Sequence, residues 1–291
     1  MTHTPLAIIN FTPDSFSDGG NFFSVEKSLA RIRYLKSIGV SHIDIGAQST
    51  APFNKDTGEA EEIRRLNILL NDDFIKEVEG MTFSLDSFRP SVVWFVWNKI
   101  KKNSPKEFIW NDVSGVLDGA VLDFLKESKI FSYVLCHNLV SKREATCAHM
   151  DYVISSKGSL FVKSVVDFFD SRLKKLPLEY RRQIILDNCY GFAKSLDQNY
   201  LLIKNQSLLE ESFPDVKGWL VGVSRKSFLR KIMFDNILSP VASPLEQNSL
   251  LSVLEISCVR KFFNRECNYY IRTHVPENFV AVSKLDMITK A

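Results

Sequence analysis

Short apolar runs alternate with longer amphipathic runs along the whole chain. The short runs are typical of buried strands, and the longer ones repeat apolar residues at the three-to-four-residue spacing of helices. Eight strands are predicted, over residues 6–10, 42–46, 82–87, 107–115 (with its loop), 131–137, 182–188, 219–227 and 268–274. The helices expected after them cover residues 25–39, 60–70, 90–100, 119–127, 160–176, 196–212 and 244–263, with a last one after Pro276.

This alternation determines the predicted fold. Strands alternating with helices indicate parallel βαβ units, and eight such units in 291 residues match the (β/α)₈ TIM barrel. The rival fold is an open doubly wound sheet, which usually carries a glycine-rich dinucleotide turn after its first strand. Neither GxGxxG nor GxxxxGK[ST] occurs, and no linker or break in composition is visible, so we expect a single domain over residues 1–291.

Composition and charge narrow the function further. The chain is 45% hydrophobic, which is enough for a large core, and its net charge of +3 favours neither nucleic acid nor a membrane surface. No apolar run approaches the ~20 residues of a membrane span. The basic stretch 99–106 is better explained as a solvated helix end than as a nucleic-acid contact. Without a basic, signal-like N-terminus, the chain is expected to be cytoplasmic.

The five cysteines carry no obvious pairing signal. Their number is odd and no CxxC pair is present, which predicts reduced thiols. Cys189 has no second Cys or His at metal-ligand spacing, so we expect it to be a buried neutral thiol.

Polar residues follow every predicted strand. The chemistry of a TIM barrel lies at these strand ends, although any one such residue could be a helix cap or a turn former. Eight polar ends together favour a polar pocket on one face of the barrel. The ends carry Asn10, Asp44 with residues 46–50, Asp86, Asn111 and Asp112, His137 and Asn138, Asp187 and Asn188, residues 224–226, and residues 272–274.

The residue types at these ends limit the ligand. Carboxylate and amide groups at Asp86, Asn111 and Asp187 suit a flat heterocycle with amino and ring N–H donors. Cations are expected at the last two strands, where barrels often bind phosphate, and arginine can bind phosphate through two N–H groups. These cations are Lys226, Arg272 and His274. The pocket therefore fits a nitrogen-rich ring attached to a phosphate.

The stretch IINFTPDSFSDGG at residues 8–20 resembles the N-terminal signature of the dihydropteroate synthase family. HIDIGAQST, SLDSF, WNDVSG, LDNCYGFAK, VGVSRKS and IRTH follow in the family's order, so the resemblance covers residues 6–274. It implies a (β/α)₈ barrel, a homodimer and Mg²⁺ dependence. It also implies condensation of hydroxymethyl-dihydropterin diphosphate with p-aminobenzoate, giving dihydropteroate and pyrophosphate for folate synthesis.

The resemblance also implies a role for each matching residue. Asp86, Asn111, Asp187 and Lys226 would hold the pterin ring. Asn10, Arg272 and His274 would hold the diphosphate, with Asn10 also near Mg²⁺. Thr50, Pro52, Phe192 and Ser227 would line the p-aminobenzoate site. Asp86, Lys226, Arg272 and Asp14 would act in a dissociative reaction, and the TPDSFSDGG loop and residues 48–58 would close over the ligands to exclude water.

The chain departs from the family pattern in four places. In the second loop, Gln48 replaces a Glu and Ala51 replaces an Arg that is expected to organise the closed loops. Asn188 and Cys189 replace the Pro-Gly of the family's DPG turn. The usual RVHDV and LMHM stretches appear here as residues 272–275 and 135–138, without the Asp and without either Met.

These departures leave alternatives open. A working but divergent synthase is favoured, in which loss of the Arg lowers the rate ~10²-fold or more if that Arg is an ordinary transition-state donor. A pterin-binding paralogue that is non-catalytic or altered in specificity is the alternative. A pterin-dependent methyltransferase barrel fits less well, because that family lacks the TPDSFSDGG loop and the SRKS strand end.

Overall fold

Eight parallel strands close into a barrel in chain order, with each strand beside its sequence neighbour and β8 beside β1. The computed structural model describes residues 2–12, 24–48, 56–152, 154–236, 243–263 and 267–288. The strands are β1 (Thr2–Asn10), β2 (His42–Gly46), β3 (Thr82–Asp86), β4 (Glu107–Asp112), β5 (Phe131–Cys136), β6 (Ile184–Asp187), β7 (Gly218–Val221) and β8 (Asn268–Thr273). The predicted TIM barrel is confirmed.

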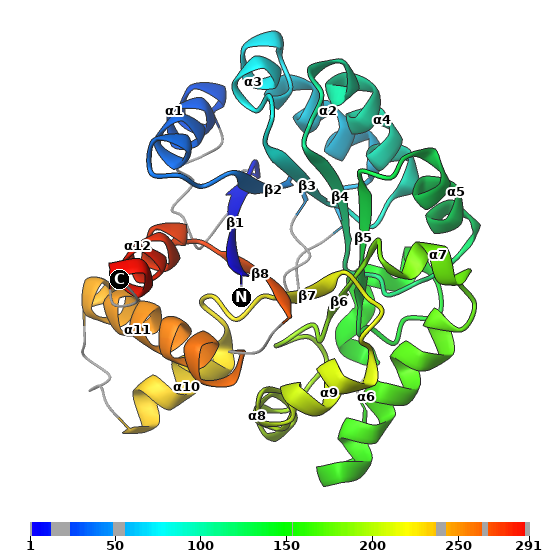
Figure 1. The fold of residues 1–291 in the computed structure, drawn as a ribbon, viewed down its shortest axis with the longest axis vertical. Helices are drawn as coiled ribbons and strands as arrows, with labels where there is room; N and C mark the ends of the chain where they lie inside the picture. The colour runs from blue at the N-terminus through cyan, green and yellow to red at the C-terminus, as the bar shows by residue number, and fades with distance from the viewer. Residues whose placement is uncertain are drawn as a thin grey trace.

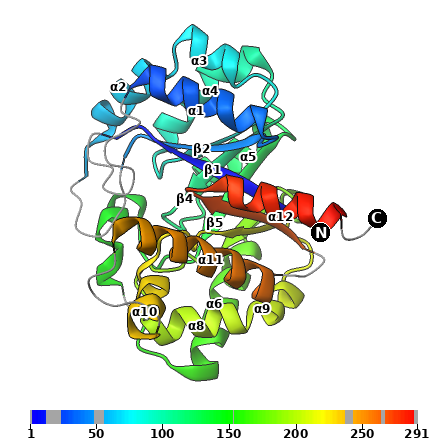
Figure 2. The same cartoon turned by 90° about the vertical axis from the view of Figure 1, so that its left-hand side faces the viewer.

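Helices surround the strands, as Figures 1 and 2 show. Seven of them follow the first six strands as α1 (Val25–Ser37), α2 (Glu59–Leu69), α3 (Asp72–Glu77), α4 (Pro90–Ile100), α5 (Gly119–Glu127), α6 (Gly158–Leu173) and α8 (Leu196–Lys204). The remaining ones are α7 (Leu178–Arg181), α9 (Gln206–Ser212), α10 (Ser227–Asn236), α11 (Pro244–Phe262) and α12 (Pro276–Ile288), with 3₁₀ turns η1 (Lys101–Asn103) and η2 (Arg143–Asp151). No helix in these described ranges is both long and apolar enough to cross a membrane.

The structure corrects two of the predicted elements and contains helices that were not predicted, among them α3, α7 and α10. The seventh predicted strand is too long, because β7 ends at Val221 and Ser227 already begins α10. Between them the chain turns, with Arg225 at a left-handed φ of 57°. The helix predicted over 196–212 is two helices, because the backbone at Asn205 leaves helical geometry between α8 and α9.

Of the three buried apolar clusters in the described residues, two hold the barrel together. The larger one lies between the strands and the surrounding helices. The smaller one, called the apolar plug below, fills the barrel interior and consists of Leu6, Ile109, Val134, Ile185, Leu220 and Tyr270. Successive side chains of a strand point to opposite faces, so residues two positions beyond this plug also point inward. The interior pattern therefore determines which side chains reach the barrel mouth.

Candidate active site at the barrel mouth

A polar layer lies directly above the apolar plug. Asn111, Asp187 and Arg272 follow Ile109, Ile185 and Tyr270 of the plug by two residues, so the strand period points them inward at the carboxyl ends of β4, β6 and β8. On β3, Asp86 follows Ser84 in the same way, and Ser84 is the register partner of Ile109. These four sequence-predicted residues therefore meet in one place.

Arg272 joins two carboxylates at the centre of this layer. Its Nε donates to Asp44 Oδ2 at 2.6 Å, and an Nη2 hydrogen donates to Asp86 Oδ2 at 2.5 Å. Asp44 is fully buried, and it also accepts from Ser84 Oγ at 2.5 Å and from Asn111 Nδ2 at 3.2 Å. Within the described residues, Arg272 Nη1 has no hydrogen-bond partner. Asp44 thus orients both Arg272 and Asn111 while one guanidinium nitrogen remains available.

Burial shifts the protonation of both pocket carboxylates. It raises the pKa of Asp86 to about 7, with the Asp44 charge adding to the rise and the Arg272 charge opposing it. Burial also raises the pKa of Asp187, against the backbone N–H of Cys189, which donates to Asp187 Oδ1 at 2.7 Å. A ligand that offers N–H donors therefore stabilises the ionised form of each carboxylate.

Lys226 lies in the turn between β7 and α10 and points into the same pocket. Its Nζ lies 4.3 Å from the centre of the Phe192 ring, which is a cation–π contact. Burial, with help from the Arg272 charge, lowers the pKa of Lys226 to about 8. Gly191 has a φ of +79°, and a Cβ there would lie 3.1 Å from Lys226 Cδ, so glycine gives this lysine its space.

A cavity of about 50 Å³ lies between these groups. It is lined by Asp86, Asn111, Val113, Cys136, Asp187, Cys189, Tyr190, Phe192, Leu220, Gly222, Lys226 and Arg272. A larger groove of about 460 Å³ lies elsewhere, against α8 and the start of α6, and contains none of the strand-end residues. The chemistry is therefore concentrated in the small cavity.

The surroundings of His274 oppose the charged form that the sequence predicts for it. Its Nδ1 lies 3.1 Å from Ser224 Oγ, and burial, with nearby Arg225 and Arg272, lowers the pKa of His274 to about 3. Burial, with these cations and Lys226 nearby, therefore favours the neutral imidazole in the ligand-free site. The expectation that His274 meets the diphosphate stays a prediction.

His137 and Asn138 also differ from the expectation of a polar end on every strand. Because Cys136 points inward, His137 points outward and packs against the rings of Phe168 and Phe169 in the outer core. Asn138 Nδ2 donates to Val113 O at 2.7 Å, which ties neighbouring loops together. Both residues are structural.

Asn10 offers an oxygen beside Asp86. A Cβ added to Gly46 would lie 3.5 Å from Asn10 Oδ1 and 3.8 Å from Asp86 Oδ2, so both oxygens face the same glycine. The Asn10 side chain makes no hydrogen bond to any other described residue. Mg²⁺ is usually bound through one or two carboxylates together with waters and phosphate oxygens. Asp86 supplies a carboxylate and Asn10 a neutral oxygen beside it, so the donors present are compatible with this ion.

Of the remaining predicted residues, some are described by the structure and others lie outside the described ranges. Phe192 lines the cavity, whereas Ser227 is exposed at the start of α10. Asp14, Thr50, Pro52 and Ala51 lie outside the described residues. At the start of the second loop, the Gln48 amide accepts from Arg89 and donates to Asp56 Oδ1 at 3.2 Å.

Sequence reasoning missed the role of Asp44. The signal was an Asp between two isoleucines in HIDIG, because a carboxylate inside an apolar strand needs a buried partner.

Sequence reasoning also failed on the cysteines. Cys136 and Cys189 form a disulfide with a Cα–Cα distance of 5.7 Å, so the expectation of reduced thiols was wrong for this pair. The β5–β6 register pairs Cys136 with Asp187 and brings Cys189 close, although 53 residues separate the cysteines.

Comparisons with known proteins show which family the chain belongs to. The sequence pattern of the family described as "Pterin binding enzyme" matches residues 6–261. The type-3 dihydropteroate synthase of Escherichia coli is 32% identical over 245 residues, covering 82% of this chain and 86% of that protein. A mitochondrial folate synthesis bifunctional protein of Pisum sativum is 32% identical over 241 residues, covering 78% of this chain and 44% of that protein.

Solved structures share the fold. The dihydropteroate synthase of Yersinia pestis, in complex with a sulfonamide drug, has a TM-score of 0.73 at 22% identity and covers 99% of this chain and 94% of its own. The Xanthomonas albilineans enzyme with 7,8-dihydropteroate has a TM-score of 0.67 at 22% identity, covering 99% and 93%. With a family pattern over most of its length and a relative 32% identical, this chain belongs to the dihydropteroate synthase family of pterin-binding enzymes.

Proposed function

We propose that the chain is a working dihydropteroate synthase. It condenses 6-hydroxymethyl-7,8-dihydropterin diphosphate with p-aminobenzoate and releases pyrophosphate and dihydropteroate. The observation that carries this proposal is the set of inward-facing groups in one cavity: two carboxylates, an amide and two cations. A neutral, apolar or purely cationic mouth would not suit a ring rich in N–H groups that carries an anionic tail.

The orientation of Asn111 supports binding of the pterin edge. Its Nδ2 donates to the Asp44 carboxylate, which fixes the amide so that its carbonyl oxygen is left for the cavity. Asp86, Asp187 and Asn111 then present acceptors to the amino and ring N–H groups of a pterin. Lys226 offers the complementary donor for a ring carbonyl or ring nitrogen. Binding of this edge ionises Asp86, because N–H donors favour its carboxylate form.

The same groups support a dissociative reaction. The bond between the methylene carbon and the bridging oxygen breaks first, and the pyrophosphate leaves with the electron pair. Arg272 stabilises the departing anion through its available Nη1, and the Asp86 carboxylate stabilises the positive charge on the pterin and its methylene carbon. The amine of p-aminobenzoate then attacks the carbon and loses its proton, so no strong protein base is required.

Mg²⁺ is the ion we propose for the diphosphate, with Asn10 beside Asp86 as its protein contact. When bound, it neutralises charge on the pyrophosphate oxygens.

The p-aminobenzoate site that we propose is formed by Phe192, Ser227, Thr50 and Pro52, and sulfonamides would compete there as mimics of that substrate. A cytoplasmic location and a homodimer are also part of this proposal, and they rest on family resemblance.

Turnover tests the proposal directly. The purified chain is mixed with the dihydropterin diphosphate, p-aminobenzoate and Mg²⁺, and pyrophosphate and dihydropteroate are followed together. Equal amounts of both support a synthase. Pyrophosphate alone means that water captures the cation, which contradicts a working synthase. Neither product, with pterin binding still detectable by calorimetry, identifies the chain as a non-catalytic paralogue.

Two pairs of matched variants separate the site from the fold. Asp86→Asn should nearly abolish turnover, whereas Asp170→Asn on the exposed face of α6 should leave it unchanged. Lys226→Ala should weaken pterin binding, whereas Lys174→Ala, which removes the surface partner of Asp170, should not. Full activity of Asp86→Asn would show that the reacting pterin lies elsewhere.

A further inference from the structure

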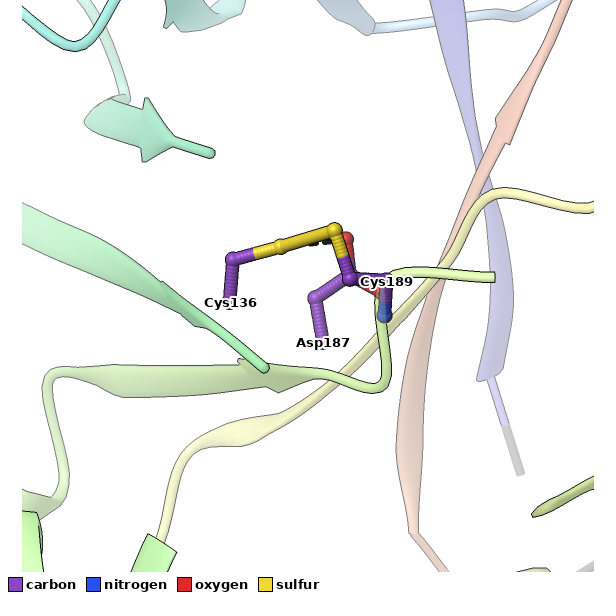
Figure 3. Close-up of side chains that lie close together, drawn as sticks. All are labelled: Cys136, Asp187 and Cys189. Carbon is purple, nitrogen blue, oxygen red and sulfur yellow. Dashed lines mark hydrogen bonds between the residues drawn. A yellow bond between two sulfur atoms is a disulfide. The ribbon is translucent and has the colours of Figure 1, made fainter. Parts of the chain in front are cut away.

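Two cysteines meet in the wall of the pterin cavity. Cys136 is the last residue of β5, and Cys189 is the second residue after β6. Figure 3 shows them joined by a disulfide beside Asp187. Their Cα atoms are 5.7 Å apart, which is the usual separation for a disulfide. Both are buried, with exposed fractions of 2% and 3%, yet both line the cavity.

The pair contacts the carboxylate that we propose binds pterin. The Cys189 backbone N–H donates to Asp187 Oδ1 at 2.7 Å, and Cys136 Sγ lies 3.8 Å from Asp187 Oδ2. A disulfide sulfur has no hydrogen, so Oδ2 receives no S–H donor in the oxidised form. In the dithiol form a Cys136 S–H group would point at this oxygen and compete with the N–H groups of a pterin.

The disulfide also fastens the turn that carries Phe192. This turn contains left-handed residues at Cys189 (φ 55°) and Ala193 (φ 49°), which are conformations that side chains other than glycine rarely adopt. Lys194 Nζ holds it from beneath through the carbonyls of Cys189, Phe192 and His137, each at 3.1 Å. The disulfide adds a covalent tie from this turn to β5.

We propose that Cys136 and Cys189 form a reversible redox-modification site, oxidised by hydroperoxides, whose disulfide form binds pterin more tightly. This inference rests on the proposed function. The disulfide preorganises the wall that holds Asp187 and Phe192, and preorganisation raises affinity by lowering the ordering cost of binding. In the reducing cytoplasm proposed for this chain, disulfides are usually transient and redox-sensing.

The chemistry balances with hydrogen peroxide as oxidant. One cysteine thiolate attacks a peroxide oxygen, the O–O bond breaks, and a sulfenic acid and hydroxide form. The second thiol attacks the sulfenic sulfur and expels its oxygen as water, giving the disulfide. In total, two thiols and one peroxide become one disulfide and two waters. A small oxidant suits a cavity of about 50 Å³, and a dithiol reductant reverses the reaction by thiol–disulfide exchange.

The experiment compares the two redox states of the full chain. Protein reduced with dithiothreitol is divided, one half is treated with hydrogen peroxide, and both halves are tested with 6-hydroxymethylpterin by calorimetry. Peptide mass spectrometry without reductant follows the disulfide. We expect a peptide that joins Cys136 to Cys189 and a Kd for the pterin about three- to tenfold lower in the oxidised half. Dithiothreitol should restore the original Kd.

Two variants locate the effect. Cys136→Ser cannot form the disulfide, so its Kd for the pterin should be the same with and without peroxide. Cys267→Ser should respond like the natural chain, and it is a stringent control because Cys267 is more exposed than either member of the pair. The comparison within the natural chain stands on its own if Cys136→Ser fails to fold.

Three results would overturn the inference: no joined peptide at any peroxide concentration, equal pterin affinity in both states, or a redox response that persists in Cys136→Ser. Equal affinity in both states would leave the proposed function standing. Pterin binding in neither state would overturn the proposed function and the control of binding, while the joined peptide would still decide whether the cysteines form a redox site.

Discussion

Replacement of Asp44 by Asn tests whether this buried carboxylate sets both the position of Arg272 and the protonation of Asp86. The change keeps the size of the side chain and removes its charge. Arg272 Nε, 2.6 Å from Asp44 Oδ2 in the natural chain, then loses its anionic partner and keeps Asp86 alone. The Asp44 charge helps to raise the pKa of Asp86 to about 7, so its removal should lower that pKa.

The size of the effect follows from the burial of the pair. At 2.6 Å the Coulomb attraction is about 6 kcal/mol with an effective dielectric constant of 20, before the desolvation cost is subtracted. Removing one partner of a buried pair typically costs about 3–5 kcal/mol. We expect about 3 kcal/mol of lost stability, because Arg272 retains Asp86 and its side chain is 24% exposed. Misplacement of Arg272 should lower kcat/KM about 10- to 100-fold.

The pH dependence of kcat/KM separates this role from simple destabilisation. In the natural chain the acid limb should lie at about pH 7, because turnover requires the Asp86 carboxylate. In Asp44→Asn this limb should move to lower pH. Ser84→Ala is the matched control, since it removes the 2.5 Å hydrogen bond to Asp44 Oδ1 but no charge, and its limb should stay in place. A limb that does not move in Asp44→Asn would refute the reasoning.

The remaining predictions concern charge, a buried ion pair and the disulfide. Because burial lowers the pKa of Lys226 to about 8, kcat/KM should fall above this pH. In Lys226→Arg this alkaline fall should move to higher pH. If the fall does not move, it is caused by the titration of another group. Arg143→Met removes the cationic partner of the fully buried Asp112, which keeps the Tyr133 hydroxyl and the Ser114 N–H as neutral donors. The change should cost about 3–5 kcal/mol in urea unfolding, so a loss below about 1 kcal/mol would contradict this prediction. Under oxidising conditions Cys136→Ser should lower the free energy of unfolding by about 4 kcal/mol, since the natural disulfide closes a loop of 53 residues, and equal stability would argue against the loop-closure effect.

The sequence was sufficient for the barrel and for the residues that strand alternation aims inward. Asp86, Asn111, Asp187 and Arg272 lie two positions beyond interior residues, so periodicity and family motifs both locate them. The same periodicity misled at Lys226. VGVSRKS alternates like a strand, but the structure ends β7 early and delivers the lysine from a turn.

The properties that sequence could not supply depend on neighbours in space. Burial, together with the charges of Arg225, Arg272 and Lys226, lowers the pKa of His274 to about 3, and no local pattern around residue 274 carries that information. The disulfide of Cys136 and Cys189 depends on which strands are adjacent and in which register, so counting the intervals between cysteines could not reveal it. Asp44 acts through Arg272, which is 228 residues away along the chain.

The pairing of β8 with β1 has a consequence for how the protein is made. Six residue pairs join these strands, from Thr2↔Asn268 to Ala7↔Thr273, so the first strand to leave the ribosome must wait for the last one. Until then β1 presents an unpaired edge, which is a template for aggregation. Asp44 and Asp86 lack their shared arginine over the same interval. We therefore expect the nascent chain to depend on chaperones and to acquire its site only after β8 has been translated.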